Sequence, residues 1–589
     1  MHRRRIKIWL AIAIIGMVIL VGRLAQIQLI STESFSKYGV NLLEKSVAQR
    51  TQEMVIDNGR GNFLDQSGEP LIYKKVPVLI LFPFLNHLDW PVEEVAAAIG
   101  VRDEALLRSL NKAKNPIAFG SPKPFRLSES QMEAINKLKI PGVFAVEKKY
   151  PLSDINAEQL IGITGENSTL LKDRYGEKEF APRTLVGLSG LEKSFDEFLV
   201  GEGKSKLVYH VDGVGSPLFG INVKYTEPAN PFYPLNVKTT LDKDLQEKAE
   251  KLVDQHQIKN GGLVLLDIET NTVLAMVSRP HLNRSQPFGD KGVQNQMLKQ
   301  QIPGSVFKTV VAAAAIDYGL QPPSRTFDCN QNIYGKEDPN YQHGILDFTE
   351  SFARSCNRTF ADLAKELKDK DEGIIEAYAE KLSLTGKVGW TGSVFHTEDF
   401  EQMADEDSGR VFHNEEAKKD DNYVALSAIG QHEVRVTPLA VANMMATIAR
   451  GGDKQMVRVV ESVEYQNGSK VFGFNEKKLT GETVSPFTAQ KLQKLLREVI
   501  VNEEGTGRWF QELPYAVAGK SGTAETGIMK EGEQTYNKWF AGYFPYENPK
   551  YALVTVNLGV HGDEGGVNPL FADMVKEVSA HDKTEEKTD

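Results

Sequence analysis

Cysteine is almost absent from this sequence, since only Cys329 and Cys356 occur among 589 residues. So small a number excludes a fold built on a disulfide framework and a metal site made of several thiolates. It leaves the redox compartment open. A bridge between Cys329 and Cys356 is possible, although the sequence does not favour it.

The sequence also lacks an excess of basic residues. Its 69 Lys and Arg are outnumbered by 79 Asp and Glu, which gives a formal net charge of −10. Neither a zinc-finger spacing nor a basic stretch interleaved with aromatic residues occurs. Because binding to nucleic acid relies on a positive surface that neutralises phosphates, we expect no nucleic-acid partner.

One long apolar run stands out, at the N-terminus. It follows Arg3, Arg4, Arg5 and Lys7 and extends over residues 8–22, then past Arg23 to Ile30. A bilayer takes about 20 residues to cross, so we expect a membrane anchor within residues 1–30, with Arg23 reaching to the interface. The basic flank predicts a cytoplasmic N-terminus.

A cleaved signal peptide is the alternative to an anchor, because its apolar core has a similar length. No clear small-x-small cleavage site follows the run, so we favour the anchor. Either interpretation places the bulk of the chain outside the cytoplasm.

The remaining length is sufficient for more than one core, and we expect two domains. Residues 31–235 predict a non-catalytic α+β pedestal of the dimerisation type: a strand, a turn and a strand within 53–73, then helices within 90–138. Glycines and turn residues between 187 and 215, followed by Pro228, Pro231 and Pro234, place the boundary before Asn236.

Residues 236–580 predict a second domain, with a strand at 236–241, a helix at 244–257 and two antiparallel strands at 262–267 and 272–278. Two charged segments interrupt or follow this pattern. The acidic segment from Thr397 to Asp421 suggests a surface insertion, and residues 581–589 predict a disordered tail.

A Ser-x-x-Lys pattern can place a hydroxyl nucleophile and its base on one face of a helix. It occurs at Ser34/Lys37, Ser109/Lys112 and Ser305/Lys308. Only Ser305 follows a Pro-Gly turn and precedes an almost wholly apolar helix, residues 306–316. Such a helix is buried, and its N-terminus offers free N–H groups to a developing oxyanion.

Burial and a second cation would lower the pKa of Lys308 in the direction that a base requires. Lys520, in Lys520-Ser521-Gly522-Thr523, could supply that cation from a strand in which Gly522 lets a substrate backbone approach closely. Between these motifs lies Ser355-Cys356-Asn357, within a predicted helical stretch from Glu350 to Leu367. Each motif alone is weak evidence for a catalytic site, but the occurrence of all three in one chain is strong evidence.

The three motifs occur in the order found in penicillin-binding proteins and their β-lactamase relatives. More narrowly, the chain resembles the monofunctional class B D,D-transpeptidases. The resemblance covers nearly the whole chain through further motifs: Arg60-Gly61 to Leu71, Gly187 to Glu192, Thr240-Leu241-Asp242 leading to Gln246, Gly430-Gln431 with Thr437-Pro438-Leu439, Gly505-Thr506-Gly507, and Trp539 to Tyr543. No signature of the glycosyltransferase domain of the bifunctional class A enzymes is found.

The resemblance implies catalytic roles for five residues. Ser305 would be the acylated nucleophile and Lys308 its general base. Ser355 and Lys520 would relay a proton to the leaving amine, and Asn357 would hold the amide of the donor peptide.

It implies binding roles for the strand that carries Lys520. The backbone N–H groups of Ser305 and Thr523 would form the oxyanion hole. The hydroxyls of Ser521 and Thr523 would receive the terminal carboxylate, next to Gly522.

Other polar and aromatic residues have structural interpretations. We expect His343 and His432 at the surface, Trp539 and Tyr543 in strand packing, and Glu192 as a structural residue near the domain boundary.

The resemblance therefore predicts an anchor, an elongated pedestal and a serine transpeptidase domain, with an antiparallel sheet flanked by helices. It implies cross-linking of D-Ala-D-Ala stem peptides, inhibition by β-lactams, no metal or organic cofactor, and a polytopic glycan polymerase as membrane partner. Two alternatives stay open: hydrolysis, as a carboxypeptidase or β-lactamase, and a non-catalytic β-lactam sensor or scaffold.

Overall fold

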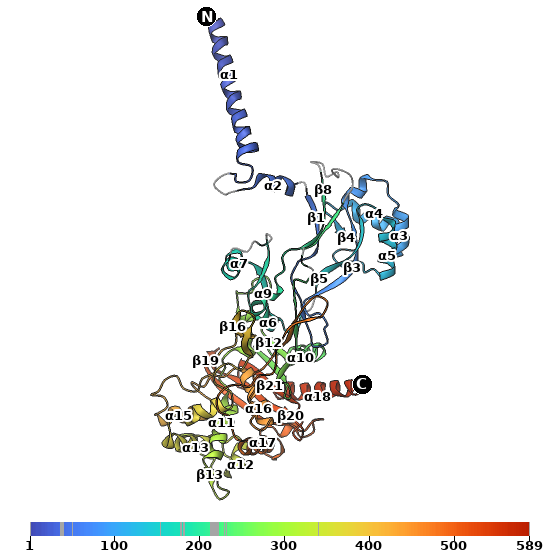
Figure 1. Cartoon of the computed structure of the whole chain (residues 1–589). Helices are drawn as coiled ribbons and strands as arrows, with labels where there is room; N and C mark the ends of the chain where they lie inside the picture. Colours follow the sequence, from blue (N-terminus) through green and yellow to red (C-terminus); the bar gives the residue numbers. More distant parts are fainter. Residues whose placement is uncertain are drawn as a thin grey trace. The chain divides into compact units, whose positions relative to one another are not determined.

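The computed structural model in Figure 1 describes residues 2–35, 40–49, 51–152, 155–176, 180, 183–211, 223–228, 230, 232–339, 341–562 and 564–587. The chain forms two compact units. Unit 1 comprises residues 1–59, 73–151 and 202–231, and unit 2 comprises residues 60–72, 152–201 and 232–589. Each unit is therefore assembled from segments that are separated in the sequence.

The N-terminal helix α1 (His2–Ala25) continues through a wider turn, Gln26–Ile30. Residues 3–30 have the length and apolar composition of a membrane span, and the most apolar part of this helix is not buried in a core. A signal sequence has the same properties, so the expected anchor stays consistent with the structure. Lys37, the partner of Ser34, lies outside the described residues.

Unit 1 is organised around the long antiparallel pair of β3 (Tyr73–Leu81) and β5 (Val143–Pro151). The helices predicted within 90–138 are present and cover this pair with buried side chains: α3 (Val92–Ile99), α4 (Asp103–Asn111) and α5 (Glu129–Leu138). The short strand β4 (Ile117–Ala118) extends the sheet beside β3. A second sheet contains β1 (Thr51–Asp57), β8 (Ser205–His210) and β9 (Lys224–Thr226). Helix α2 (Leu42–Gln49) comes directly before β1 in the chain.

The first part of unit 2 consists of short elements from residues 60–72 and 152–201. They are β2 (Phe63–Leu64), α6 (Glu158–Ile161), β6 (Thr164–Glu166), α7 (Ser168–Tyr175), β7 (Leu185–Gly187), α8 (Gly190–Ser194) and α9 (Asp196–Leu199). The buried Arg60 guanidinium connects them, donating to Glu192 Oε2 at 2.9 Å and to Asp196 Oδ1 at 2.8 Å. Glu192 therefore has the structural role that the sequence predicted.

A mixed sheet joins these elements to the rest of unit 2. Strand β2 pairs in parallel with β10 (Asn236–Thr239), which pairs on its other side with β17 (Val460–Glu464) and then β18 (Lys470–Gly473). Thr239 Oγ1 donates to Leu64 O at 2.8 Å, beside this pairing. The compact units differ from the expected contiguous boundary before Asn236, because residues 60–72 and 152–201 have hydrogen-bond partners in the later part of the chain.

The main sheet of unit 2 has five antiparallel strands in the order β12 (Thr272–Arg279), β11 (Gly261–Asp267), β21 (Tyr551–Val560), β20 (Glu533–Phe544) and β19 (Ala518–Lys530). Strand β11 lies inside the sheet, between β12 and β21, and is almost wholly buried, as expected where both faces of a sheet are covered. Strand β19 lies at the edge of the sheet. This arrangement confirms the predicted antiparallel sheet flanked by helices.

The helices around this sheet begin at capping residues that the sequence supplies. Asp242 accepts a hydrogen bond from Leu245 N, and Thr437 accepts one from Ala440 N ahead of Pro438. The helices are α10 (Lys243–Gln255), α11 (Lys308–Asp317), α12 (Phe348–Ala353), α13 (Asn357–Lys370), α14 (Ile374–Lys381), α15 (Asp421–Ala428), α16 (Pro438–Ala449), α17 (Pro486–Val501) and α18 (Asn568–Glu585). The remaining short strands are β13 (Thr326–Asp328), β14 (Ile345–Asp347), β15 (Thr391–Val394) and β16 (Thr397–Glu401).

The two faces of the sheet are distinguished by alternate residues of β20. Phe540 and Phe544 contact Phe571 of α18 on one face. Because side chains alternate along a strand, Trp539 and Tyr543 point to the opposite face, where both are buried. The predicted packing role of these two aromatic residues is confirmed.

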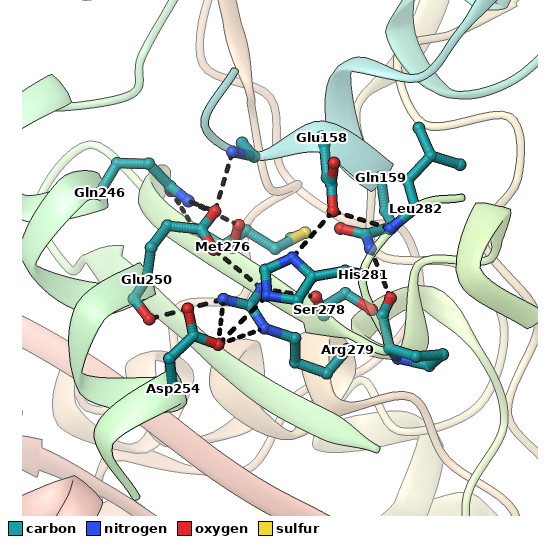
Figure 2. Close-up of polar contacts among 12 residues, drawn as sticks. Glu158, Gln159, Gln246, Glu250, Asp254, Met276, Ser278, Arg279, His281 and Leu282 are labelled. Atoms are coloured by element: carbon teal, nitrogen blue, oxygen red, sulfur yellow. Dashed lines mark hydrogen bonds and ion pairs between the residues drawn. The ribbon is translucent and has the colours of Figure 1, made fainter. Parts of the chain in front are cut away.

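A polar cluster ties α6 to α10 and to the end of β12 (Figure 2). Arg279 donates to Glu250 Oε2 at 2.8 Å and to Asp254 Oδ1 at 2.7 Å. The ring of His281 lies between Asp254 and Glu158, with nitrogen to oxygen distances of 3.3 and 3.2 Å. Residues 152–201 are thus held to the end of β12 and to α10 by charged contacts.

The predicted disordered tail is wrong over residues 581–585. Helix α18 continues through Glu585, because Asp582 accepts hydrogen bonds from the hydroxyls of Tyr515 at 2.6 Å and Tyr551 at 2.7 Å. His581 also contacts Asp242 at the start of α10.

Candidate functional site

Ser305 lies in a 3₁₀ turn, Gly304–Phe307, that leads directly into α11. Gly304 has a φ of +58°, and a Cβ at this position would approach Thr523 O to 2.3 Å, so only glycine fits. Its N–H donates to Gly430 O at 2.9 Å. The half-buried Ser305 is thereby held against Thr523 of the edge strand β19.

Lys308, at the start of the apolar helix, is completely buried. Its Nζ donates to Ser355 O at 2.6 Å and to Asn357 Oδ1 at 2.7 Å, and lies 3.0 Å from Ser355 Oγ. Burial, and then the charge of Lys520, hold the pKa of Lys308 well below its ordinary value. The Lys308 amine is therefore poised to lose its proton and act as a base.

Lys520 is the second buried amine of the site, with no exposed side-chain surface. Burial lowers its pKa to about 7. Its Nζ donates to Ser521 O at 3.3 Å and lies 5.8 Å from the centre of the Phe352 ring. At neutral pH this group can both carry and release a proton.

The backbone at Ser355 differs from the predicted continuous helix over Glu350–Leu367. Helix α12 ends at Ala353 and α13 begins at Asn357, and Ser355 between them has a left-handed φ of +62°. Such a conformation is costly for a residue other than glycine and is often found at functional sites. Here the break directs both Ser355 and Asn357 toward Lys308.

A disulfide stabilises this break. Cys356, the middle residue of the motif, is bonded to Cys329, with a Cα–Cα distance of 5.8 Å. The sequence did not favour this bridge. Thr506, of the Gly505-Thr506-Gly507 motif, also braces the turn, because its N–H donates to Ala353 O at 3.1 Å and its hydroxyl accepts from Ser521 Oγ at 2.8 Å.

The two faces of β19 present different groups. Gly522 faces the nucleophile, since a Cβ there would approach Pro303 O to 2.5 Å and Val306 Cγ2 to 2.9 Å. By strand alternation Lys520 shares this face, and Ser521 and Thr523 point to the other one. The predicted carboxylate-binding hydroxyls are thus neighbours on one face.

The free edge of β19 faces Ser305. Gln431 closes part of this edge, because it donates to Thr523 O at 3.4 Å and accepts from Glu525 N at 3.1 Å. In an antiparallel edge strand the N–H and C=O of one residue point the same way, so Thr523 N–H also faces outward. The two N–H groups predicted for an oxyanion hole, those of Ser305 and Thr523, therefore lie at one edge.

A cavity of about 550 Å³ lies on the α18 face of the same strand. It begins at Ser521 and Thr523 and is bounded by aromatic, cationic and small apolar side chains. Its lining residues are Trp509, Phe510, Ser521, Gly522, Thr523, Lys538, Trp539, Gly566, Val567, Asn568, Pro569 and Ala572.

Comparison with known proteins identifies the family to which this site belongs. The family model described as "Penicillin binding protein transpeptidase domain" matches residues 261–576, which is more than half of the chain. The chain belongs to this family. A second model, "Penicillin-binding Protein dimerisation domain", matches residues 55–231.

Individual penicillin-binding proteins are similar over much of the sequence. Penicillin-binding protein PbpB of Mycolicibacterium smegmatis is 28% identical over 62% of this chain and 56% of its own length. A peptidoglycan D,D-transpeptidase FtsI homolog of Mesostigma viride is 26% identical over 63% of this chain and 64% of its own length. The chain thus spans just over half the length of the PbpB proteins that it matches.

Solved structures support the fold. Penicillin-binding protein 2B from Streptococcus pneumoniae matches with a TM-score of 0.58 at 18% identity, over 90% of this chain and 99% of its own. A chain of a peptidoglycan synthase complex matches with a TM-score of 0.64 at 22% identity, over 97% of both chains.

The acidic segment of this penicillin-binding protein is packed into unit 2, so the predicted surface insertion is wrong for its central part. Glu406 is buried and accepts from Val388 N at 2.9 Å and Gly389 N at 2.8 Å, and burial raises its pKa to about 7. Gln402 is also buried and accepts from two backbone N–H groups of the 459–460 region. Hydrogen bonds to buried backbone explain why these polar residues leave the surface.

The acidic segment also forms hydrogen bonds with the residues that precede Ser305. Lys299 Nζ donates to Asp407 Oδ1 at 3.0 Å and to Asp405 O at 2.7 Å, and Gln300 N donates to Asp407 Oδ2 at 3.1 Å. Asp405 also accepts from Gly190 N of α8 at 3.0 Å. The sequence showed the acidic composition but gave no signal for these partners.

Of the two histidines expected at the surface, only His432 is exposed; burial, and then the charges of Arg354 and Lys308, lower the pKa of His343. His432 is 46% exposed. His343 is half-buried, and its Nδ1 lies 3.3 Å from Arg354 Nη2.

Proposed function

We propose that this chain is a serine D,D-transpeptidase that cross-links peptidoglycan stem peptides and is inhibited by β-lactams. The observation that carries the proposal is the position of the buried Lys308 amine, which meets Ser355 and Asn357 and lies three residues after Ser305. Membership of the penicillin-binding protein transpeptidase family supports the same conclusion.

In the first step Lys308 removes the proton of Ser305, whose oxygen attacks the carbonyl carbon between the two terminal D-alanines. A neutral amine is needed for this, and the lowered pKa of Lys308 favours the neutral form. The N–H groups of Ser305 and Thr523 stabilise the negative charge that develops on the carbonyl oxygen. Preorganised donors of this kind contribute about 3 to 4 kcal/mol of transition-state stabilisation.

In the second step the tetrahedral intermediate collapses and the terminal D-Ala leaves as an amine. Ser355 delivers the proton, resupplied through Lys308 and Lys520, whose pKa of about 7 suits proton exchange. Asn357 holds the amide of the donor stem, and the hydroxyls of Ser521 and Thr523 receive the terminal carboxylate beside Gly522.

We further propose that α1 anchors the chain with the N-terminus in the cytoplasm and both units outside. The basic residues ahead of the apolar span support this orientation. A polytopic glycan polymerase is the proposed membrane partner, since cross-linking requires newly made glycan strands.

The test is covalent labelling with a fluorescent penicillin. The full chain in detergent and its Ser305→Ala and Lys308→Met variants are incubated with the drug, and the labelled band is followed over time. We expect a persistent adduct on the unmodified chain, none on Ser305→Ala, and labelling slowed by about 10² to 10⁴-fold in Lys308→Met.

Other outcomes identify the alternatives. Rapid loss of the adduct with destruction of the drug would favour a β-lactamase, and release of D-Ala without cross-links in the presence of acceptor peptide would favour a carboxypeptidase. A folded chain that takes up no label would contradict the assignment of Ser305 and favour a non-catalytic scaffold.

A further inference from the structure

The main sheet of unit 2 has two edge strands, β12 and β19, and a glutamine side chain binds to the edge of each. At β12 the Gln246 amide accepts from Met276 N at 2.8 Å and donates to Met276 O at 3.0 Å (Figure 2). This amide takes the place of one peptide unit of a neighbouring strand. Gln246 is 1% exposed and also donates to Glu250 Oε1 at 3.0 Å, so the closure of β12 is part of the core.

At β19 the Gln431 amide makes the same kind of contact, but more weakly. It donates to Thr523 O at 3.4 Å and accepts from Glu525 N at 3.1 Å. The side chain is half-buried, and among the described residues it has no other hydrogen-bond partner. Its backbone is fixed separately, because Gln431 N donates to Leu426 O at 3.0 Å. The amide can therefore leave the edge by rotation of the side chain alone.

The acyl donor needs one of the groups that Gln431 holds. When the carbonyl oxygen of the donor lies at Thr523 N–H, the donor residue is paired with Thr523 as in an antiparallel ladder. In a hydrogen-bonded antiparallel pair, the two residues exchange both of their N–H···O=C bonds. The amide N–H of the same donor residue then lies opposite Thr523 O, where the Gln431 amide is bound. The donor and the Gln431 amide therefore exclude each other at this oxygen.

From these contacts we propose, resting on the proposed transpeptidase function, that the Gln431 side chain is a removable plug, which closes the edge of β19 until an acyl donor displaces it. A free strand edge otherwise pairs with any extended chain through main-chain hydrogen bonds. The donor must break both hydrogen bonds of the plug and forms one of its own at Thr523 O. The plug thus slows acylation by ligands that extend along β19, and it does not affect ligands that end at the acyl carbonyl.

The experiment compares two β-lactams on the full chain in detergent. Benzylpenicillin carries an acylamino group that extends along β19, whereas penicillanic acid is the same bicyclic acid without this group. The second-order rate of acylation is measured by mass spectrometry of the intact protein for the unmodified chain, Gln431→Ala and Gln431→Met. Methionine keeps the length of the side chain but cannot form either hydrogen bond.

The matched control is His432→Asn, which changes the neighbouring exposed side chain and leaves Gln431 in place. Asparagine suits this position because the backbone of His432 is left-handed, with a φ of +58°. Thermal midpoints are recorded for all variants. They should stay close to that of the unmodified chain, since the plug contributes no core packing.

We expect both Gln431 variants to react with benzylpenicillin about 3 to 10-fold faster than the unmodified chain, since net contributions of hydrogen bonds to an equilibrium are of this size. With penicillanic acid the rates of the unmodified chain and both variants should agree within about twofold. His432→Asn should match the unmodified chain with both drugs.

Benzylpenicillin rates that are unchanged or lower in both Gln431 variants would overturn the plug while leaving acylation of Ser305 intact. Equal acceleration with the two drugs would also overturn it, because penicillanic acid does not reach Thr523 O. An unmodified chain that neither drug acylates would instead overturn the transpeptidase function, and the plug together with it.

Discussion

Lys308 and Lys520 show how single residues acquire function from their surroundings. Both amines are removed from water by apolar neighbours, and each has its pKa lowered, mainly by burial. Lys520 adds a like charge that lowers the pKa of Lys308 further. The sequence predicted this pair because a lysine in an otherwise apolar helix can only be buried.

Replacing Lys520 by methionine should move the pH dependence of acylation. Below pH of about 7 Lys520 carries a charge that disfavours the protonated form of Lys308, and its removal lets the pKa of Lys308 rise. Penicillin acylation needs neutral Lys308, so its rate falls when the pH is lowered. In Lys520→Met this fall should begin at a higher pH than in the unmodified chain, and the rate should drop by about 10-fold per pH unit below the new pKa of Lys308.

Measurement of the acylation rate from pH 5 to pH 10 checks this. Lys520→Arg keeps a cation and should leave the acid limb near its original position. A loss of rate in Lys520→Met that is the same at every pH would contradict an electrostatic role and leave only a proton-relay role.

The Cys329–Cys356 bond should stabilise the turn that carries Ser355 and Asn357. It closes a loop with a sequence separation of 27 residues, for which the chain-entropy model gives about 3 to 4 kcal/mol. A Cys329→Ser, Cys356→Ser double variant should therefore unfold at lower temperature and acylate more slowly. Reductant should lower the thermal midpoint of the unmodified chain but not that of the variant, and an insensitive unmodified chain would exclude the bond.

At the scale of elements, the site depends on how one segment holds another. Within residues 402–410, Asp405 contacts α8, and Asp407 contacts Lys299 and Gln300, which lie six and five residues ahead of Ser305. Residues 402–410 thus fix the position of the chain that precedes Ser305. Their acidic composition predicted an exposed insertion, because sequence patterns do not reveal which backbone groups a carboxylate will meet.

Asp407→Ala should slow penicillin acylation by about 10-fold, since small displacements of a reacting group are costly in rate. The matched control is Asp399→Asn, an exposed position on β16 of the same segment. Both variants should keep thermal midpoints close to that of the unmodified chain. An unchanged rate in Asp407→Ala, or an equal fall in both variants, would remove the positioning role of Asp407.

At the scale of the whole molecule, segments that are neighbours in the sequence belong to different units. Phe63, fully buried, and the buried ion pairs of Arg60 belong to unit 2, although they precede most of unit 1 in the sequence. A catalytic core cut at the boundary that the sequence suggested would lack β2, one of the two strands that pair with β10.

A fragment of residues 232–589 should therefore be less stable than the full chain. Loss of Phe63 alone, by analogy with large-to-small core substitutions, costs about 3 to 5 kcal/mol. We expect a lower thermal midpoint, together with acylation that is weak or absent. A fragment with the midpoint and acylation rate of the full chain would show that residues 60–72 and 152–201 are dispensable for the site.

The sequence predicted features that depend on local patterns better than features that depend on distant partners. The buried helix of Lys308, the strand of Lys520 and the glycine at Gly304 follow from local patterns. The left-handed turn at Ser355, the Cys329–Cys356 bond and the interleaved units depend on partners that are distant in sequence. Proline and glycine signals near residue 235 located a linker, but they carry no information on which earlier strand β10 pairs with.

The pairing of β2 with β10 has a consequence for how the molecule is made. Leu64 and Thr239 are 175 positions apart, so at ribosomal rates of about 5 to 20 residues per second β2 waits roughly 9 to 35 s for its partner. During that interval the hairpin of β3 and β5 can close from its own contiguous segment, while Phe63 stays without its core. The nascent chain therefore exposes an unpaired apolar strand early, and a holding factor that covers it would raise the yield of folded protein.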